Sequence, residues 1–149
     1  MILTSDHIRQ RLEGTELPKS PTDITMPPGS SRWPEPMREQ LSQTLKPAGV
    51  LVPLIERQND LSVLLTRRSG ELKHHAGQVS FPGGRMEDSD VDVEAAALRE
   101  TEEEVGIASR HISVLGYLNT MPTITGYAVT PVVGIVSAEA KLRIDTTEV

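Results

Sequence analysis

The stretch from Phe81 to Ile107, "FPGGRMEDSDVDVEAAALRETEEEVGI", places a glycine pair ahead of a strongly acidic helical segment. Residues 92–105 are expected to form the best helix of the chain, with Ser89 or Asp90 as its cap and Gly106 as its end. Four glutamates fall within about one turn of this helix, and each like-charged pair weakens an isolated helix by roughly 0.2–0.5 kcal/mol. Such a costly arrangement suggests that something collects the carboxylates.

The acidic residues of this helix form a stripe. At the helical period, Glu100, Glu103 and Glu104 share one face, and three carboxylates on one stripe supply the hard oxygen ligands that Mg²⁺ or Mn²⁺ prefers. Arg99 lies four residues before Glu103 and can pair with it. The alternative is a solvated charged face, but such a face normally mixes acidic and basic residues. No basic residue lies between Glu100 and Gly106, so we predict a metal site.

The glycine pair before the helix, Gly83 and Gly84, follows a short predicted strand at 78–81. Glycine allows backbone to approach a ligand closely, although many glycine pairs are simply turns. Arg85, the next residue, either touches a phosphate or is solvated. We expect a loop here that delivers a ligand to the acidic helix.

The rest of the chain alternates apolar runs with turn signals. Strands are predicted at 48–55, 61–66, 78–81, 111–118 and 127–136, and helices at 4–12, 37–45 and 92–105. Strands on both sides of one central helix indicate an α+β or α/β sandwich.

We expect two parts along the chain. Residues 1–47 comprise an N-terminal helix, an arm with six prolines between Gly14 and Pro36, and a short helix packed on the domain. Residues 48–149 form the main domain. Because the sequence stops at Val149 without a closing element, we expect this domain to be truncated at the C-terminus.

Composition excludes several classes of function. The net charge is −6 and aromatic residues make up 3% of the chain, which argues against a general nucleic-acid binder. The absence of cysteine excludes thiol-ligated metal. The first residues contain no apolar signal segment, and no apolar run is long enough to span a bilayer. We therefore expect a soluble, cytoplasmic protein with no membrane partner.

The acidic helix resembles a known sequence motif. "RETEEEVGI" (99–107) is similar to the second half of the Nudix box, R-E-U-x-E-E-x-G-U with U apolar, and Thr101 is its one departure. In the first half, G-x5-E-x7-R, counting from Gly84 puts Asp90 at the acidic position, one residue too far from Arg99. The resemblance implies a Nudix-like α/β/α sandwich with a mixed central sheet, and hydrolysis of a nucleoside diphosphate derivative. Nudix sandwiches commonly dimerise, so a homodimer is possible.

A second motif lies upstream. "LLTRRSGELKHHAGQVSFPGG" (64–84) resembles the signature of the coenzyme A diphosphatase branch of this family, roughly L-L-T-x-R-S-x3-R-x3-G-x-V-x-F-P-G-G. Arg68 is in place, and Lys73 stands where the pattern has arginine, which keeps the charge but loses the bidentate fork. Together with Arg67 and the histidines at 74–75, these cations form a basic patch that suits the 3′-phosphate of coenzyme A. Alternatively, they are surface charges at the end of a strand and in a loop.

The resemblance implies a role for each group of residues. The implied catalytic residues are Arg99, Glu100 and Glu103; the implied metal ligands are Glu100, Glu103 and Glu104, with Mg²⁺ or Mn²⁺; and the implied substrate-binding residues are Arg67, Arg68, Lys73, Gly83, Gly84 and Arg85. The general base stays open between a glutamate of the box and an acidic residue of a later loop, where Glu139 and Glu148 are the late glutamates.

Three functions remain open. The first is a coenzyme A diphosphatase that releases 3′,5′-ADP and 4′-phosphopantetheine. The second is a hydrolase of another nucleoside diphosphate derivative, such as ADP-ribose or a dinucleotide. The third is a binding or regulatory domain of the same fold without turnover.

Overall fold

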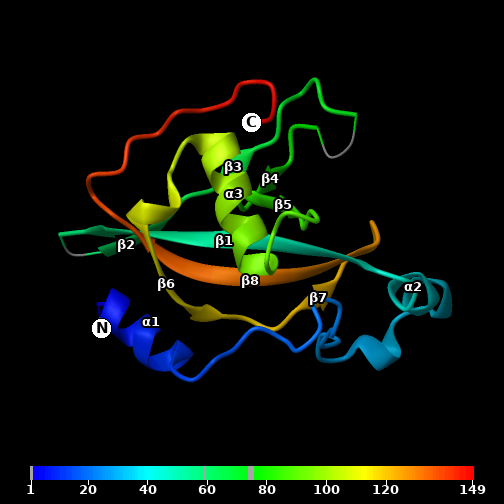
Figure 1. The fold of residues 1–149 in the computed structure, drawn as a ribbon. Coiled ribbons are helices and arrows are strands. Elements are labelled where there is room, and N and C mark those ends of the chain that lie inside the picture. The colour runs from blue at the N-terminus through cyan, green and yellow to red at the C-terminus, as the bar shows by residue number, and fades with distance from the viewer. Residues whose placement is uncertain (1, 59, 74–75) are drawn as a thin grey trace.

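The fold is built around two long parallel strands. The computed structural model describes residues 2–58, 60–73 and 76–149. Strand β1 (Lys46–Arg57) runs parallel to β8 (Tyr127–Val136) along ten paired residues, from Lys46↔Tyr127 to Ile55↔Val136. This pairing joins two segments that lie about eighty residues apart in sequence, and it forms the centre of the sheet (Figure 1).

Shorter strands complete the sheet. Its order is β2-β1-β8-β6, with β5 paired to β1 and β7 paired to β8, and all of these other pairings are antiparallel. The bounds are β2 (Asp60–Val63), β5 (Gly83–Arg85), β6 (Ile112–Tyr117) and β7 (Met121–Pro122). Strands β3 (Thr66–Arg67) and β4 (Val79–Ser80) form a separate antiparallel pair. The predicted mixed central sheet is confirmed.

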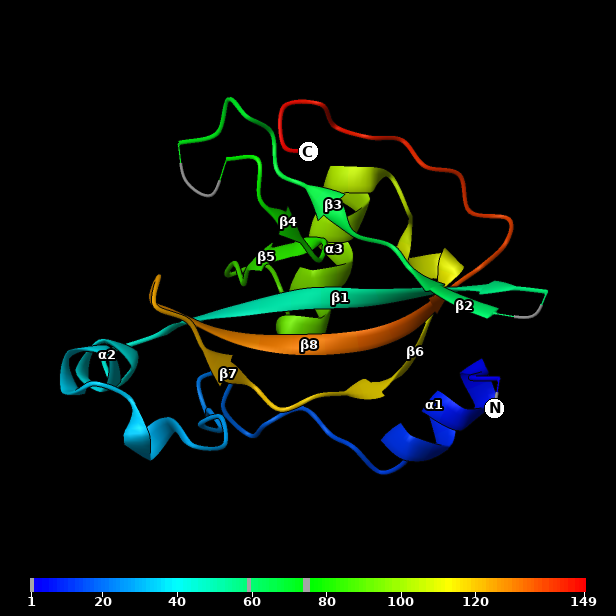
Figure 2. The same ribbon diagram turned by 180° about the vertical axis from the view of Figure 1, so that it is seen from behind.

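Helices cover both faces of this sheet. Helix α3 (Val93–Val105) packs on one face and α1 (Ser5–Leu12) on the other, as the two opposite views show (Figures 1 and 2). Short helices α2 (Glu35–Leu41), η1 (Ser30–Arg32) and η2 (Ser109–His111) lie in the connections. The predicted α+β class with an α/β/α layering is therefore confirmed. Among the described residues, no helix has the length and apolarity needed to cross a lipid bilayer.

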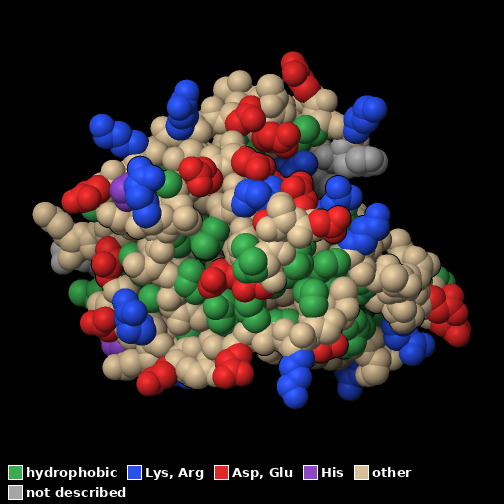
Figure 3. Space-filling model, viewed as in Figure 1, with side chains coloured by type: hydrophobic (Ala, Val, Ile, Leu, Met, Phe, Trp, Pro, Cys, Tyr) green, Lys and Arg blue, Asp and Glu red, His purple; other side chains and the backbone are tan. Residues whose placement is uncertain are grey.

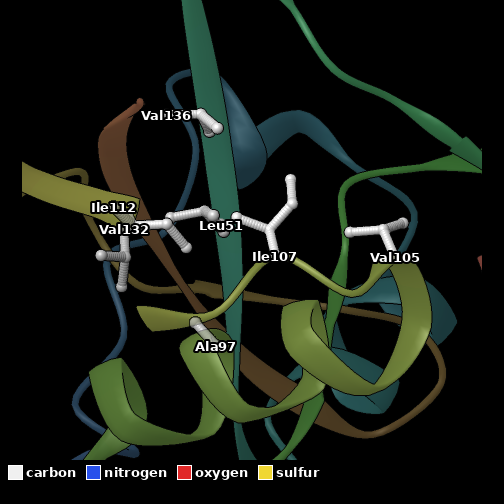
Figure 4. Close-up of a cluster of buried hydrophobic side chains, with 7 residues drawn as sticks. All are labelled: Leu51, Ala97, Val105, Ile107, Ile112, Val132 and Val136. Atoms are coloured by element: carbon white, nitrogen blue, oxygen red, sulfur yellow. The ribbon is translucent and has the colours of Figure 1, made fainter. Parts of the chain in front are cut away.

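The main core lies between α3 and the sheet. Leu51 at the centre of β1 is fully buried and packs with side chains from α3, β6 and β8 (Figure 4). The cluster comprises Leu51, Ala97, Val105, Ile107, Ile112, Val132 and Val136. Gly49 brings the helix close, because a methyl group on Gly49 would lie 2.1 Å from the Val93 carbonyl oxygen. The glycine thus fixes the height of α3 above β1.

The start and end of α3 are set by two local signals. Gly106 adopts a left-handed conformation (φ 77°) and ends the helix, as predicted. The predicted caps Ser89 and Asp90 are wrong, since Asp92 caps the helix by accepting a hydrogen bond from the Ala95 N–H. Asp90 is instead engaged by Arg99.

The N-terminal segment contributes to the second core. The predicted helix at 4–12 is confirmed as α1, and its Thr4 cap accepts from the His7 N–H. Leu12 packs against Leu54 and Val133 on the face of the sheet away from α3. The proline-rich arm then follows the sheet edge, where the Thr25 N–H donates to the Thr120 carbonyl at 2.7 Å. The division into parts at 47/48 stays a prediction.

Two other elements differ from expectation. The helix predicted at 37–45 spans Glu35–Leu41, because Pro36 is tolerated in the first turn and Ser42 ends the helix. The strand predicted at 61–66 is divided, with β2 ending at Val63 and β3 starting at Thr66. This break lets the chain leave the main sheet and form the β3–β4 pair.

Candidate active site

The glycine pair is part of the sheet. Gly83 and Gly84 lie in β5 and pair with Val50 and Gly49 of β1, so the predicted loop at this position is wrong. The backbone is held by strand pairing with β1, and a methyl group on Gly83 would lie 2.4 Å from the Gly49 carbonyl oxygen, so glycine permits the close approach of the two strands. The sequence pattern could not show this pairing, because β1 and β5 are far apart in the chain.

Two glutamates of α3 lie against this strand. A methyl group on Gly84 would lie 2.7 Å from the Glu100 carboxyl carbon, so the Glu100 side chain occupies the space above Gly84. The Glu104 carboxylate accepts a hydrogen bond from the backbone of Gly83. Glu100 and Glu104 therefore meet the same short strand, as expected for two residues that are four apart on one helix face.

The environment of both carboxylates disfavours their ionised forms. Burial raises the pKa of Glu104 to about 7, and the neighbouring Glu100 adds to the rise, while the Gly83 hydrogen bond and Arg68 oppose it. Burial also raises the pKa of Glu100, against the opposing effect of Arg99. Arg99 pairs with Glu100 at 3.1 Å and Arg68 acts on Glu104, yet the pKa of both carboxylates stays raised, so the nearby cations offset their burial only in part. A further cation placed between α3 and β5 would favour the ionised form of both carboxylates.

Arg99 forms hydrogen bonds with several acidic side chains beside α3 and β5. Its guanidinium donates to both oxygens of Asp90 at 3.0 and 2.9 Å, to Glu100 at 3.1 Å and to both oxygens of Glu103 at 3.3 Å. It also donates to the Arg85 carbonyl at 3.2 Å, which ties α3 to the end of β5. These bonds raise the pKa of Arg99, so it stays charged. Figure 3 shows acidic side chains gathered over α3 with basic ones among them.

The Asp90–Arg99 pair is expected to stabilise the fold in a pH-dependent manner. The Arg99 guanidinium lowers the pKa of the Asp90 carboxyl below its ordinary value of 3.8. The contribution of the ionised Asp90 carboxylate to the free energy of unfolding is therefore complete at neutral pH and is lost as pH falls through the lowered pKa. We expect Asp90→Asn to reduce the free energy of unfolding by about 1–3 kcal/mol at pH 7. Urea unfolding at pH 7 and pH 3 should show that the difference in unfolding free energy between wild type and Asp90→Asn becomes smaller at pH 3.

A matched control for this prediction is Glu87→Gln. The Glu87 side chain is exposed and lies 3.8 Å from Arg99, so its loss should change stability by less than about 0.5 kcal/mol. A gap between wild type and Asp90→Asn that stays constant from pH 7 to pH 3 would contradict the assigned role of the charge.

A cavity of about 720 Å³ adjoins the strand of glycines. Ala48 and Val50 line it, and they alternate along β1 with Gly49 and Leu51, which contact α3. The cavity therefore lies against the face of β1 that points away from α3. Strand β5 borders the cavity and also meets the carboxylates of α3. It is the place where the two halves of the site join.

The structure brings only some of the predicted substrate-binding residues into this cavity. Its lining includes Arg68, Gly83, Gly84 and Arg85. The Arg68 Nε is buried without a hydrogen-bond partner among the described residues, which is costly unless a ligand accepts from it. Arg67 is exposed and donates to the Gly77 carbonyl. Like Lys73, which is also exposed, it is outside the cavity lining. The histidines at 74–75 lie outside the described residues.

Several lining residues were missed by sequence reasoning. They are Ala48, Val50, Gln78, Ser80, Phe81, Thr123, Thr125, Tyr127 and Val129. Strand alternation could have placed Tyr127 and Val129 on one face of the predicted strand at 127–136. Only the parallel pairing of that strand with β1 shows that this face forms a cavity wall. Thr123 and Thr125 carry no local signal.

The acidic residues fit a divalent cation in part. Glu100 and Glu104 offer hard oxygens at one strand, whereas Glu103 is turned toward Arg99. Among the described residues, no three acidic or histidine side chains converge on one point. Mg²⁺ is commonly held by one or two carboxylates together with water and substrate phosphates, which matches this donor set. The later glutamate Glu148 also lies near enough to raise the pKa of Glu104.

The chain is similar to known proteins in sequence. Residues 45–142 match the NUDIX domain. The chain is 47% identical over 116 residues to proteins described as uncharacterized Nudix hydrolase NudL, from Escherichia coli O1:K1 and from Shigella boydii serotype 18. The match covers 78% of this chain and 59% of each relative. The chain thus spans less than two thirds of the length of these curated relatives.

Solved structures share the fold at lower identity. An Ap4A hydrolase from C. elegans, in a binary complex, superimposes with a TM-score of 0.58 at 18% identity, over 68% of this chain and 74% of that one. The Nudix hydrolase RenU from M. smegmatis gives a TM-score of 0.55 at 22% identity, over 66% and 63%. With the domain match from 45 to 142, these comparisons show that the chain belongs to the Nudix family.

Proposed function

We propose that this chain carries the active site of a metal-dependent hydrolase that cleaves the diphosphate bond of coenzyme A or its derivatives. The observation that carries the proposal is the buried Nε of Arg68 in the cavity lining, which has no hydrogen-bond partner within residues 2–58, 60–73 and 76–149. A guanidinium held in this way is suited to a phosphate oxygen. Coenzyme A carries a 3′-phosphate in addition to its diphosphate, so its recognition needs a cation beyond the reacting centre.

The arrangement of β5 supports the proposed reaction. A diphosphate bound in the cavity beside β5 would extend toward Glu100 and Glu104, which meet the same strand. A divalent ion held there would neutralise phosphate charge and lower the pKa of a water molecule. We propose Mg²⁺ or Mn²⁺, with Glu100 and Glu104 as ligands.

The remaining residues of the box have supporting roles in this proposal. Arg99 keeps Glu103 at the rim of the site, 3.3 Å from its guanidinium, from where a small rotation would let it serve as a third ligand or accept a proton. The positive charge of Arg85 lines the cavity beside the glycines and would contact the diphosphate. Arg67 and Lys73 stay predicted contacts for parts of the substrate outside the cavity.

A second candidate function is hydrolysis of a simpler nucleoside diphosphate derivative, such as ADP-ribose or a dinucleotide. The observation that favours it is the position of Lys73, which is exposed and outside the cavity lining. With Lys73 outside, Arg68 and Arg85 are the predicted cations that reach the cavity, and two cations suffice for a diphosphate. A homodimer and a cytoplasmic location remain family-level proposals.

A substrate panel separates the two candidates. We expect hydrolysis of coenzyme A, with Mg²⁺ or Mn²⁺, to exceed that of dephospho-coenzyme A by about tenfold or more in kcat/KM, since one charge-assisted contact contributes about 1.5–3 kcal/mol. Arg68→Gln should abolish most of this preference. The matched control is Arg57→Gln, because Arg57 is exposed and bonds Ser62 outside the cavity.

The panel has clear contrary outcomes. Equal rates on coenzyme A and dephospho-coenzyme A would remove the basis for the first candidate, and preferred cleavage of ADP-ribose would support the second. Metal binding without turnover of any diphosphate would indicate the third function considered above, a binding domain.

A further inference from the structure

A second cavity lies at the C-terminal end of α3. It has a volume of about 420 Å³ and is formed by η2 and by the segment that follows β8. Its lining comprises Gly106, Ala108, Arg110, His111, Glu139, Lys141, Leu142 and Arg143. None of these residues belongs to the cavity beside β5. This is a separate site.

The charge of this cavity differs from that of the whole chain. Three cations, Arg110, Lys141 and Arg143, face one carboxylate, Glu139, although the chain as a whole carries a net charge of −6. Among the described residues, every ion pair involves Arg99, so these three cations are not neutralised by a salt bridge. Figure 3 shows Lys, Arg and His side chains together at its upper left, where Figure 1 draws the segments around η2 and after β8.

The backbone holds the two walls of this cavity in place. The Ser137 N–H donates to the His111 carbonyl at 2.7 Å, and the Arg143 N–H donates to the Val105 carbonyl at 2.7 Å. Gly106 permits this approach, since a methyl group there would lie 2.4 Å from the Arg143 Cβ. The cations are thus held near one another by the fold.

The end of α3 does not oppose a negative ligand with free carbonyl groups. The carbonyls of Glu102, Glu104 and Val105 already accept hydrogen bonds from the N–H groups of Gly106, Asp145 and Arg143. The partial negative charge of the helix end is therefore partly compensated. The lining itself contributes three cations and one carboxylate, so its formal charge is positive.

We propose that this cavity binds a phosphate-bearing anion, either free inorganic pyrophosphate or the diphosphate of a nucleotide. Two or more negative charges in one compact group match a lining in which three cations outnumber the single carboxylate Glu139, and the volume suits a small ligand. The inference is independent of the proposed hydrolysis, because it uses neither the carboxylates of α3 nor a metal.

The test is calorimetric titration of the 149-residue chain in EDTA with inorganic pyrophosphate, phosphate and ADP. We expect pyrophosphate to bind. The double variant Arg110→Gln/Lys141→Gln removes two cations and should weaken binding by about tenfold or more, since the loss of even one charge-assisted contact predicts about tenfold. If ADP binds as tightly as pyrophosphate, the ligand is the diphosphate group of a nucleotide. If ADP binds much more weakly than pyrophosphate, the ligand is the free inorganic anion.

Two further variants make the result specific. Lys19→Gln/Arg32→Gln removes two exposed cations from the N-terminal arm and should leave the affinity unchanged. Arg57→Gln removes an exposed cation that lies outside the lining of both cavities and should also leave it unchanged. The proposal is overturned if wild type does not bind pyrophosphate, if Arg110→Gln/Lys141→Gln binds normally, or if either of these further variants weakens binding equally. Thermal unfolding of each variant checks that it is folded.

Discussion

Replacing Glu104 by glutamine should lower metal-dependent diphosphate hydrolysis by about 100-fold or more while leaving the protein folded. Glutamine keeps the size of the side chain and one oxygen acceptor for the Gly83 N–H, but it removes the negative charge. Loss of a charged metal ligand costs several kcal/mol of transition-state stabilisation, and each 1.4 kcal/mol is about tenfold in rate. Initial rates over a range of Mg²⁺ and Mn²⁺ concentrations measure the effect.

The same substitution, although it lowers the rate, should raise the free energy of unfolding above neutral pH in the absence of metal. Burial raises the pKa of Glu104 from 4.5 to about 7, so without metal the folded state resists ionisation. The wild type should lose stability as pH rises from 4.5 to 7, because the unfolded chain releases this proton first. Glu104→Gln should lack this loss and be more stable than the wild type at pH 8 in EDTA. Urea unfolding across this pH range checks it.

Glu102→Gln is the matched control. Glu102 is exposed on the same helix. The hydrolysis rate of Glu102→Gln and the dependence of its stability on pH should therefore match those of the wild type. Wild-type rates in Glu104→Gln would end the assignment of this carboxylate to the metal. A stability profile of Glu104→Gln that follows the wild type would show that the carboxyl is not buried in solution.

The sequence predicted the elements whose signals are local. Helix α3 and strand β8 were placed within one residue of their observed bounds, since apolar periodicity and the left-handed Gly106 are properties of short segments. The cap of α3 was misplaced because Asp90 and Asp92 are equally good caps by local criteria. The choice between them depends on Arg99, nine residues after Asp90, which takes the carboxylate of Asp90.

The candidate site depends on long-range pairing that a single sequence does not show. The stripe of glutamates could be read from the helical period, but the burial of Glu104 could not, because it results from the pairing of β5 with β1. In the same way, Tyr127 and Val50 line one cavity only because β8 runs parallel to β1. Motif spacing identified the chemical groups, and topology determined which of them meet.

Gly84→Ala should reduce hydrolysis by about 100-fold with little effect on the fold. Gly84 does not have a positive φ, so its backbone accepts alanine. The three atoms nearest to the added methyl group all belong to the Glu100 side chain, namely Cδ at 2.7 Å, Oε1 at 2.8 Å and Cγ at 2.9 Å. The Glu100 side chain is 21% exposed, and to admit the methyl group it would leave its position beside β5. A displacement of about 1 Å in a reacting constellation can cost about 10²-fold in rate.

Two other glycines provide contrasting controls for this prediction. Gly70→Ala adds a methyl group that has no atom of the described part of the chain within 4 Å, so it should leave rate and stability unchanged. Gly83→Ala would strike the β1 backbone, at 2.4 Å from the Gly49 carbonyl oxygen and 2.5 Å from the Val50 Cα. We expect it to lower the unfolding free energy by about 1–3 kcal/mol or more. Loss of activity in Gly84→Ala at unchanged stability therefore separates a defect of the site from a defect of the fold.

A double-mutant cycle identifies the route by which Gly84 acts. If the methyl group acts by moving Glu100, then Glu100→Gln alone should already remove most of the activity. Adding Gly84→Ala to Glu100→Gln should then cost much less than the 100-fold expected in the wild type, because residues in contact are not additive. Fully additive losses in kcat/KM would show that the methyl group on Gly84 acts directly on the bound substrate. The contact between Gly84 and Glu100 would then be incidental to catalysis.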